Sequence, residues 1–215
     1  MTDRWDRFGA ASGLVFAVLF VAGFALQDTG VLTSHVSTDE IVSRYSERGT
    51  ELRKELGATV IGFALVFLLV FLGSLHGTLR RAEGERRLLS TAALAGGVVM
   101  AVFLGASAAL ETAVPSAEGF YDNYEVDPRA VLTLATLALW ALGLAMVGAA
   151  VLVGSASLLA WKVGILPRWL ALAGFVVAAI AAFGESTAAF VVPVVLVVAW
   201  LLLVSVALVR RASPG

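Results

Sequence analysis

The stretch that decides the fold runs from Leu88 to Leu110, with the sequence LLSTAALAGGVVMAVFLGASAAL. It carries no charged residue, and as a helix rising about 1.5 Å per residue it is about 34 Å long. That length is enough to cross the hydrocarbon core of a bilayer, which is about 30 Å thick. Arg86 and Arg87 precede the stretch and Glu111 follows it directly. The stretch therefore predicts a membrane-spanning helix.

Small residues recur at every fourth position along this helix. A stripe of small side chains lets the backbones of neighbouring membrane helices approach closely. We therefore expect the helix to pack inside a bundle through this small-residue stripe, whose members are Ala93, Gly97, Ala101, Gly105 and Ala109.

The composition of the whole chain agrees with this interpretation. Apolar residues make up 60% of the 215 residues and charged residues 14%, and the mean hydropathy is +0.93. A soluble domain has roughly half apolar and a quarter charged residues, so the composition is that of a membrane protein. The absence of cysteine excludes disulfides, nucleophilic thiols and Cys-ligated zinc or iron–sulfur sites.

Six apolar segments are candidates for spanning helices. The fourth is longer than a bilayer requires, and the fifth is only just long enough. For the first, a signal peptide is the alternative, because Arg4 and Arg7 precede a short apolar run, but we expect the segment to be retained. The predicted fold is a single all-α domain over residues 1–215, a polytopic bundle with spanning helices at about 8–26, 57–79, 88–110, 130–160, 169–183 and 187–209.

A weak internal repeat suggests that these six helices form three similar hairpins. The sequence Ala-Leu-Ala-Gly ends at Gly96 in the third segment and at Gly174 in the fifth, and a related Ala-Ala-Ser-Gly ends at Gly13 in the first. Helices rich in Ala, Val, Leu and Gly also align by chance. The three-hairpin repeat is therefore one hypothesis, and chance similarity is the other.

The charged residues predict the orientation of the bundle. With the amino terminus inside, ten basic and four acidic residues fall on the inner side, against five basic and twelve acidic residues outside. Because basic residues concentrate on cytoplasmic loops, we expect a multi-pass protein of a bacterial cytoplasmic membrane with both termini in the cytoplasm. The two longer outer loops are expected at 27–56, with a short amphipathic surface helix, and at 111–129.

Ionisable residues at membrane depth are the first candidates for function, because burying them is costly. Glu111 and Glu185 end the third and fifth segments on the outer side, and Ser107 shares a helix face with Glu111. Two such carboxylates at one level can share a proton or bind a cation. The simpler interpretation is that each carboxylate ends its helix in water or pairs with Arg129.

His76 is the one histidine within a predicted membrane segment, near its cytoplasmic end. No second ligand stands at metal-binding spacing from it, so a packed histidine is a simpler interpretation than a ligand or proton site. We find no phosphate-binding loop, dinucleotide motif or nucleophile elbow. No catalytic residue, metal site or cofactor is predicted, and no nucleic-acid binding.

The layout of six helices, the sequence Leu166-Pro167-Arg168-Trp169-Leu170 and the final Arg210-Arg211 resemble small actinobacterial membrane proteins of unknown function. The resemblance implies six helices and implies no functional residue. We expect a non-enzymatic membrane protein that binds lipid, a membrane partner protein or a second copy of itself. The alternative is a small transporter or proton-coupled permease that uses Glu111 and Glu185. A membrane enzyme is the third hypothesis, but it would need His76 and an acid on one side of the membrane, and the predicted topology separates them.

Overall fold

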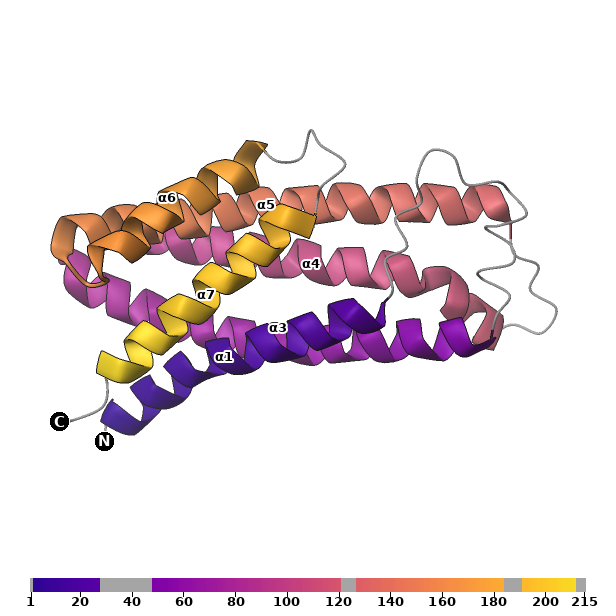
Figure 1. Ribbon diagram of the computed structural model, residues 1–215, viewed down its shortest axis with the longest axis horizontal. Coiled ribbons are helices and arrows are strands. Elements are labelled where there is room, and N and C mark those ends of the chain that lie inside the picture. The colour runs from indigo at the N-terminus through magenta and orange to yellow at the C-terminus, as the bar shows by residue number, and fades with distance from the viewer. Residues whose placement is uncertain (1, 28–47, 121–126, 184–190, 212–215) are drawn as a thin grey trace.

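The computed structural model describes residues 2–27, 48–120, 127–183 and 191–211 (Figure 1). Within these ranges the chain is all-helical, as the sequence predicts, and contains no strand. Its elements are α1 (Thr2–Leu26), α3 (Arg48–Glu83), α4 (Leu88–Phe120), α5 (Pro128–Val163), α6 (Arg168–Phe183) and α7 (Val191–Arg211).

Five of the described helices are long and apolar enough to cross a membrane. The exception is α6, which has 16 residues and is about 24 Å long. This is the segment that the sequence already marks as short. The chain is thus a membrane protein built as a helical bundle.

The helices continue further into the polar segments than hydropathy indicates. The first expected loop, 27–56, is helical from Arg48 onward, and the second, 111–129, is helical up to Phe120 and again from Pro128. Hydropathy marks only the apolar part of a helix, whereas polar residues such as those at 51–55 continue the helical hydrogen bonding without an apolar signal. The amphipathic helix expected within 27–56 falls mostly outside the described residues.

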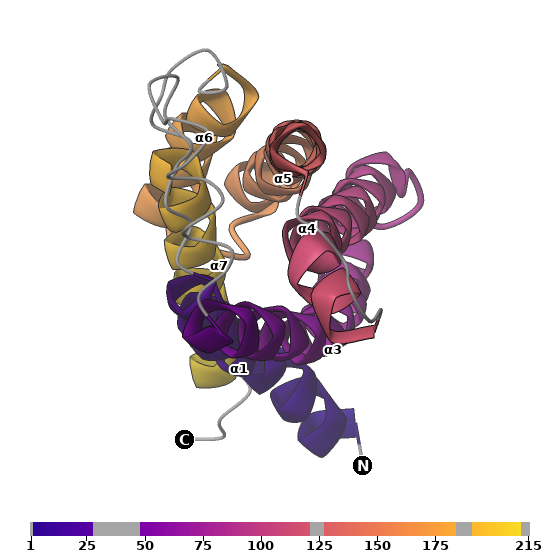
Figure 2. The same cartoon turned by 90° about the vertical axis from the view of Figure 1, so that its right-hand side faces the viewer.

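The helices are arranged as a ring in chain order. Each one packs against the next, and α7 closes the ring against α1. Figure 2 shows this arrangement along the bundle. Successive helices run antiparallel, so both chain ends lie at one end of the bundle together with the α3–α4 and α5–α6 turns (Figure 1). We call this the basic end, because it carries Arg80, Arg81, Arg86, Arg87, Lys162, Arg168, Arg210 and Arg211, and we call the opposite end the distal end.

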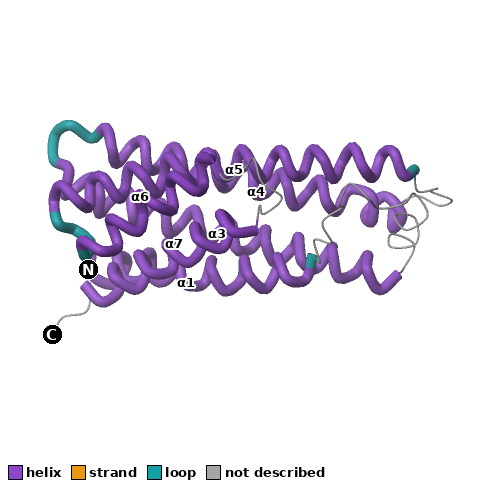
Figure 3. Tube along the Cα trace, turned by 45° about the horizontal axis from the view of Figure 1, so that its top comes forward, coloured by secondary structure: helices purple, strands orange, loops and turns teal. Residues whose placement is uncertain are grey.

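Three helices are much longer than the others. α3 and α5 have 36 residues each and α4 has 33, so they measure about 50–54 Å. α7 has 21 residues and measures about 32 Å. The long helices therefore project at the distal end beyond α6 and α7, as Figure 3 also shows.

Two different sets of small residues hold α4 in the bundle. A Cβ atom added to Gly96 would lie 2.7 Å from the Gly148 carbonyl oxygen, so α4 and α5 are in backbone contact there. The small-residue stripe faces α3 instead, since a Cβ on Gly97 would lie 2.5 Å from Leu72. Along the stripe, burial decreases toward the distal end, where Gly105 is half-buried and Ala109 is exposed.

The three glycines of the suggested repeat all lie at close helix approaches. Added Cβ atoms would collide with α7 and α3 at Gly13, with α5 at Gly96, and with α5 and α7 at Gly174. The neighbours differ from site to site, so close packing explains the shared motif. The hairpin repeat itself stays a prediction.

Candidate functional site

The structure places the predicted site residues that it describes at different ends of the bundle. The hydroxyl of Ser107 is buried and donates a hydrogen bond to the Ala138 carbonyl of α5, at 2.9 Å. This bond joins α4 and α5 through a buried polar group. The structure thus gives Ser107 a packing contact within the bundle.

His76 takes part in the contact between α3 and α4 at the basic end. Its Nδ1 lies 3.1 Å from the Ser90 carbonyl oxygen, so the tautomer with a proton on Nδ1 donates a hydrogen bond there. Ser90 and Glu111 are 21 positions apart on α4, about 32 Å. His76 and Glu111 therefore do not form one site.

Glu83 organises the same turn, and the sequence reasoning missed it. Its two carboxylate oxygens accept hydrogen bonds from the backbone N–H groups of Leu89 and Ser90, each at 2.8 Å. A carboxylate at this position satisfies donors that a helix start leaves without partners. The turn between the helices requires left-handed backbone at Gly84 and at Arg87.

Glu111 lies within α4, nine residues before the helix ends. It is half-buried, and the positive charge of Lys54 on α3 acts on its carboxylate. Pro115 stands four positions later and has no N–H, so the Glu111 carbonyl lacks its usual helical donor. Glu185 lies outside the described residues, and a shared carboxylate site stays a prediction. Within the described ranges no group of three or more His, Cys, Asp or Glu side chains could hold a metal ion.

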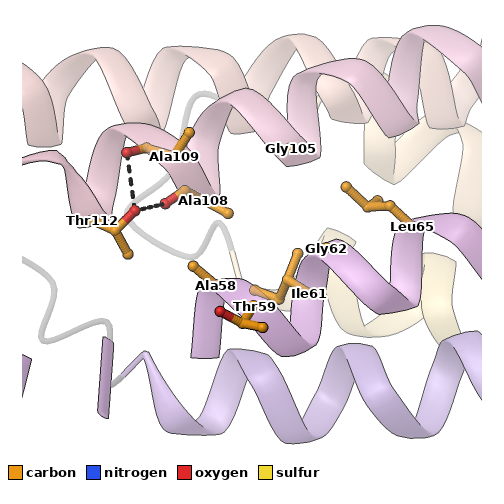
Figure 4. Close-up of a pocket in the computed structure, with 9 residues that line it drawn as sticks. All are labelled: Ala58, Thr59, Ile61, Gly62, Leu65, Gly105, Ala108, Ala109 and Thr112. Carbon is orange, nitrogen blue, oxygen red and sulfur yellow. Dashed lines mark hydrogen bonds between the residues drawn. The ribbon is translucent and has the colours of Figure 1, made fainter. Parts of the chain in front are cut away.

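A groove opens between α3 and α4 on the distal half of the bundle (Figure 4). Its cavity volume is about 310 Å³, which lies at the lower end of the roughly 300–1,000 Å³ range of small-molecule sites. Gly62 and Thr59 on α3 and Ala109 on α4 are exposed along it, so it is open at the side. Its lining consists of Ala58, Thr59, Ile61, Gly62, Leu65, Gly105, Ala108, Ala109 and Thr112.

The groove exists because the side chains of α3 that face the stripe change in size. Leu72 fills the space beside Gly97, and Leu65 approaches the position of a Cβ on Gly105 to 3.2 Å. Further toward the distal end, α3 presents Gly62 and Ala58 to α4. With small residues on both helices, the space between them is left open.

The two threonine hydroxyls that line the groove donate hydrogen bonds within their own helices. The Thr112 hydroxyl is within hydrogen-bond distance of the Ala108 and Ala109 carbonyl oxygens, at 3.0 and 3.1 Å (Figure 4). The Thr59 hydroxyl donates to the Glu55 carbonyl at 2.9 Å. Since both donors are already engaged within their own helices, the groove offers a ligand mainly methyl and methylene contacts.

Comparison with protein-family models, with curated proteins and with solved structures finds no match to this chain. The function therefore has to be argued from the groove and the charges alone. The sequence contains the signal for the groove in Ala58 and Gly62, which are small residues opposite the distal part of the stripe. Sequence reasoning took the whole stripe as packing, because the register of α3 against α4 is a tertiary property.

Proposed function

We propose that this chain is a non-enzymatic, multi-pass protein of a bacterial cytoplasmic membrane that holds a lipid acyl chain in the groove between α3 and α4. The observation that carries the proposal is a side-opening groove lined by small and apolar residues on two long membrane helices. Its two threonine hydroxyls donate within their own helices, so an alkyl chain matches it better than a polar solute does.

Charge supports an orientation with the basic end in the cytoplasm. Nine basic residues with described side chains lie at that end, the eight named above and Arg7 of α1, against Glu83 and Glu85 as acids with described side chains. Positive charge is retained on the cytoplasmic side during insertion. Both termini and both short turns then face the cytoplasm, and the distal end faces outward.

Exposed tryptophans indicate how deep in the membrane the groove lies. Trp140 and Trp161 are both exposed on α5 and are 21 positions apart, about 31 Å. Tryptophan gathers at both membrane interfaces, and this spacing matches one hydrocarbon core. On α4, Gly105 and Thr112 lie about 26 and 36 Å from Leu88. The groove therefore crosses the outer interface, with its Gly105 end inside the hydrocarbon and Thr112, Lys54 and Glu111 at headgroup level.

The test is a pair of matched glycine substitutions on α3. Gly62 and Gly73 are both exposed on α3 with open space around their Cβ positions, but Gly62 lines the groove and Gly73 does not. Gly62→Leu fills the groove, whereas Gly73→Leu adds the same side chain to the lipid-facing surface. We expect Gly62→Leu to lower lipid occupancy about tenfold, because the leucine takes space that the acyl chain fills and removes about ten van der Waals contacts of about 0.1–0.2 kcal/mol each.

The measured quantity is the number of lipid molecules that each protein retains through purification, determined by native mass spectrometry. Wild type and Gly73→Leu should carry one lipid per protein, and Gly62→Leu should carry little. Equal lipid in all three proteins would contradict the proposal. A wild-type protein that retains no lipid but forms a dimer lost in Gly62→Leu would assign the groove to a second copy of the chain.

The permease remains the second candidate because of Glu111, a half-buried carboxylate under the charge of Lys54 at the outer end of a membrane helix. It predicts a proton flux across reconstituted vesicles that Glu111→Gln abolishes. The lipid-binding proposal expects no such flux and no loss of lipid in that variant.

A further inference from the structure

The turn between α5 and α6 carries a symmetric pattern of aromatic and basic residues. Trp161 and Lys162 lie in the last turn of α5, and Arg168-Trp169 begins α6. All four side chains are exposed. The pattern includes the Leu-Pro-Arg-Trp-Leu motif, to which the groove gives no role.

The turn itself is rigidly anchored. Gly164 takes a left-handed conformation and its N–H donates to the Ala160 carbonyl, closing α5. The next two residues, Ile165 and Leu166, are buried in the core. The Leu170 N–H then donates to the Pro167 carbonyl at 2.9 Å and starts α6. The flanking cations are therefore presented from a fixed backbone.

A third helix brings another cation to this turn. The Arg211 guanidinium at the end of α7 donates to the Gly164 carbonyl, at 3.3 Å. Lys162 and Arg168 lie two positions before and four positions after Gly164, so their Cα atoms are within about 14 Å of it by chain length alone. Arg210, next to Arg211, is also exposed. Cations from α5, α6 and α7 thus meet at one turn.

No acidic side chain in the described part of the chain neutralises these cations. The acids of the basic end whose side chains are described, Glu83 and Glu85, stand at the α3–α4 turn, where Glu83 is engaged with the start of α4. Among the side chains that the structure describes, the cluster is therefore exposed positive charge without an acidic partner, and it lies between two exposed tryptophans.

We infer that this cluster, formed by Lys162, Arg168 and Arg211 between Trp161 and Trp169, binds the headgroup of an anionic phospholipid of the inner leaflet. Charge complementarity supports a phosphate-bearing anion, because Arg and Lys donate charge-assisted hydrogen bonds to phosphate oxygens. The two tryptophans place the cluster at headgroup level, where basic pockets between membrane helices recognise anionic lipids. This site lies at the opposite end from the groove and is independent of it.

The inference is tested by titrating the detergent-solubilised full chain with phosphatidylglycerol or phosphatidylcholine of identical acyl chains, followed by native mass spectrometry. Wild type should prefer phosphatidylglycerol. Arg211→Gln should reduce that preference about fivefold, which is the fold-change for about 1 kcal/mol per cation. The triple variant Lys162→Gln, Arg168→Gln, Arg211→Gln should reduce it by more than tenfold.

The matched control removes three cations from the other turn of the same end, as Arg80→Gln, Arg86→Gln, Arg87→Gln. It should keep most of the preference, since it changes the net charge equally and leaves the cluster intact. Equal losses in both triple variants would overturn the inference in favour of diffuse attraction by the whole basic end. Gly62→Leu should leave the preference unchanged, which separates this result from that of the groove.

Two further measurements complete the test. Millimolar inorganic phosphate should leave phosphatidylglycerol binding unchanged, whereas full competition by phosphate would overturn the assignment to a lipid. Thermal unfolding in detergent checks that the variants are folded. If the triple variant unfolds, the single variant Arg211→Gln at the exposed end of α7 decides the question, and an unchanged preference in that variant would contradict the inference.

Discussion

At the scale of single residues, Glu83 shows how one side chain fixes the junction of two membrane helices. Its carboxylate accepts hydrogen bonds from two N–H groups at the start of α4. His76 adds a second link between the same helices through the Ser90 carbonyl. These polar contacts set the register of α3 and α4 at the basic end, and the register in turn determines which residues face each other across the groove.

Glu83→Ala should therefore destabilise the bundle. Loss of a cap at a helix start costs about 1 kcal/mol, and two N–H donors lose their acceptor. Thermal unfolding in detergent should show a lower midpoint for Glu83→Ala than for wild type. The control is Glu85→Ala, an exposed residue of the same turn, which should unfold like wild type. Equal midpoints for all three proteins would contradict the capping role.

At the scale of helices, the closest approach between α4 and α5 depends on two glycines. A Cβ on Gly148 would lie 2.6 Å from the backbone nitrogen of Met100 and 2.7 Å from the Gly96 carbonyl oxygen. Backbone atoms have little room to yield, so the helices would have to separate. This contact brings the backbones of α4 and α5 together at this point.

Gly148→Ala should accordingly lower the free energy of unfolding by about 1–3 kcal/mol, the usual cost of overpacking. Gly77→Ala is the matched control, because Gly77 lies in α3 with open space around its Cβ position. There, Ala replaces Gly in a helix interior and should be neutral or stabilising by up to about 1 kcal/mol. Denaturation of both variants in the same detergent gives the comparison, and a Gly148→Ala protein as stable as wild type would contradict a backbone contact.

The elements could be predicted from the sequence where apolar composition and helix boundaries coincide. The expected segments 8–26 and 169–183 end at the same residues as α1 and α6. The start of α3 could not be found in this way, because residues 48–56 are polar and helical at once. The bonds made by Ser107 and His76 reach 31 and 14 positions along the chain, and no local pattern specifies such partners.

The candidate site was predictable only in part. Sequence reasoning identified the small-residue stripe and Glu111, which the structure places along and beside the groove. It could not identify Gly62, Thr59 and Ala58 as the opposing wall, since that depends on how α3 is turned against α4. Likewise, Arg211 lies 47 positions from Gly164, and only the closed ring of helices brings them together.

At the scale of the whole molecule, the helices of the bundle differ in length. α3, α4 and α5 exceed one hydrocarbon thickness by about 20 Å, and they project at the distal end. If Trp140 and Trp161 mark the two interfaces, the part of α5 before Trp140 stands outside the hydrocarbon on the side opposite the termini.

Single cysteines test this placement cleanly, because the chain has none of its own. Leu132 and Val151 are 44% and 43% exposed on α5, but Leu132 lies about 12 Å beyond Trp140 and Val151 about 16 Å inside it. In intact cells, Leu132→Cys should react with a membrane-impermeant maleimide applied outside, and Val151→Cys should not. Labelling of Leu132→Cys only from the cytoplasmic side would contradict the orientation.

The central claim is that an acyl chain occupies the groove between α3 and α4. Its most direct test uses a phospholipid with a diazirine on its acyl chain, photolysed in bilayers containing the protein, with the cross-linked residues located by mass spectrometry. We predict cross-links concentrated on the groove residues Ala58, Thr59, Ala109 and Thr112, and their loss in Gly62→Leu but not in Gly73→Leu. Cross-links spread evenly over lipid-facing residues such as Phe63, Val66 and Leu69, and unchanged in Gly62→Leu, would contradict it.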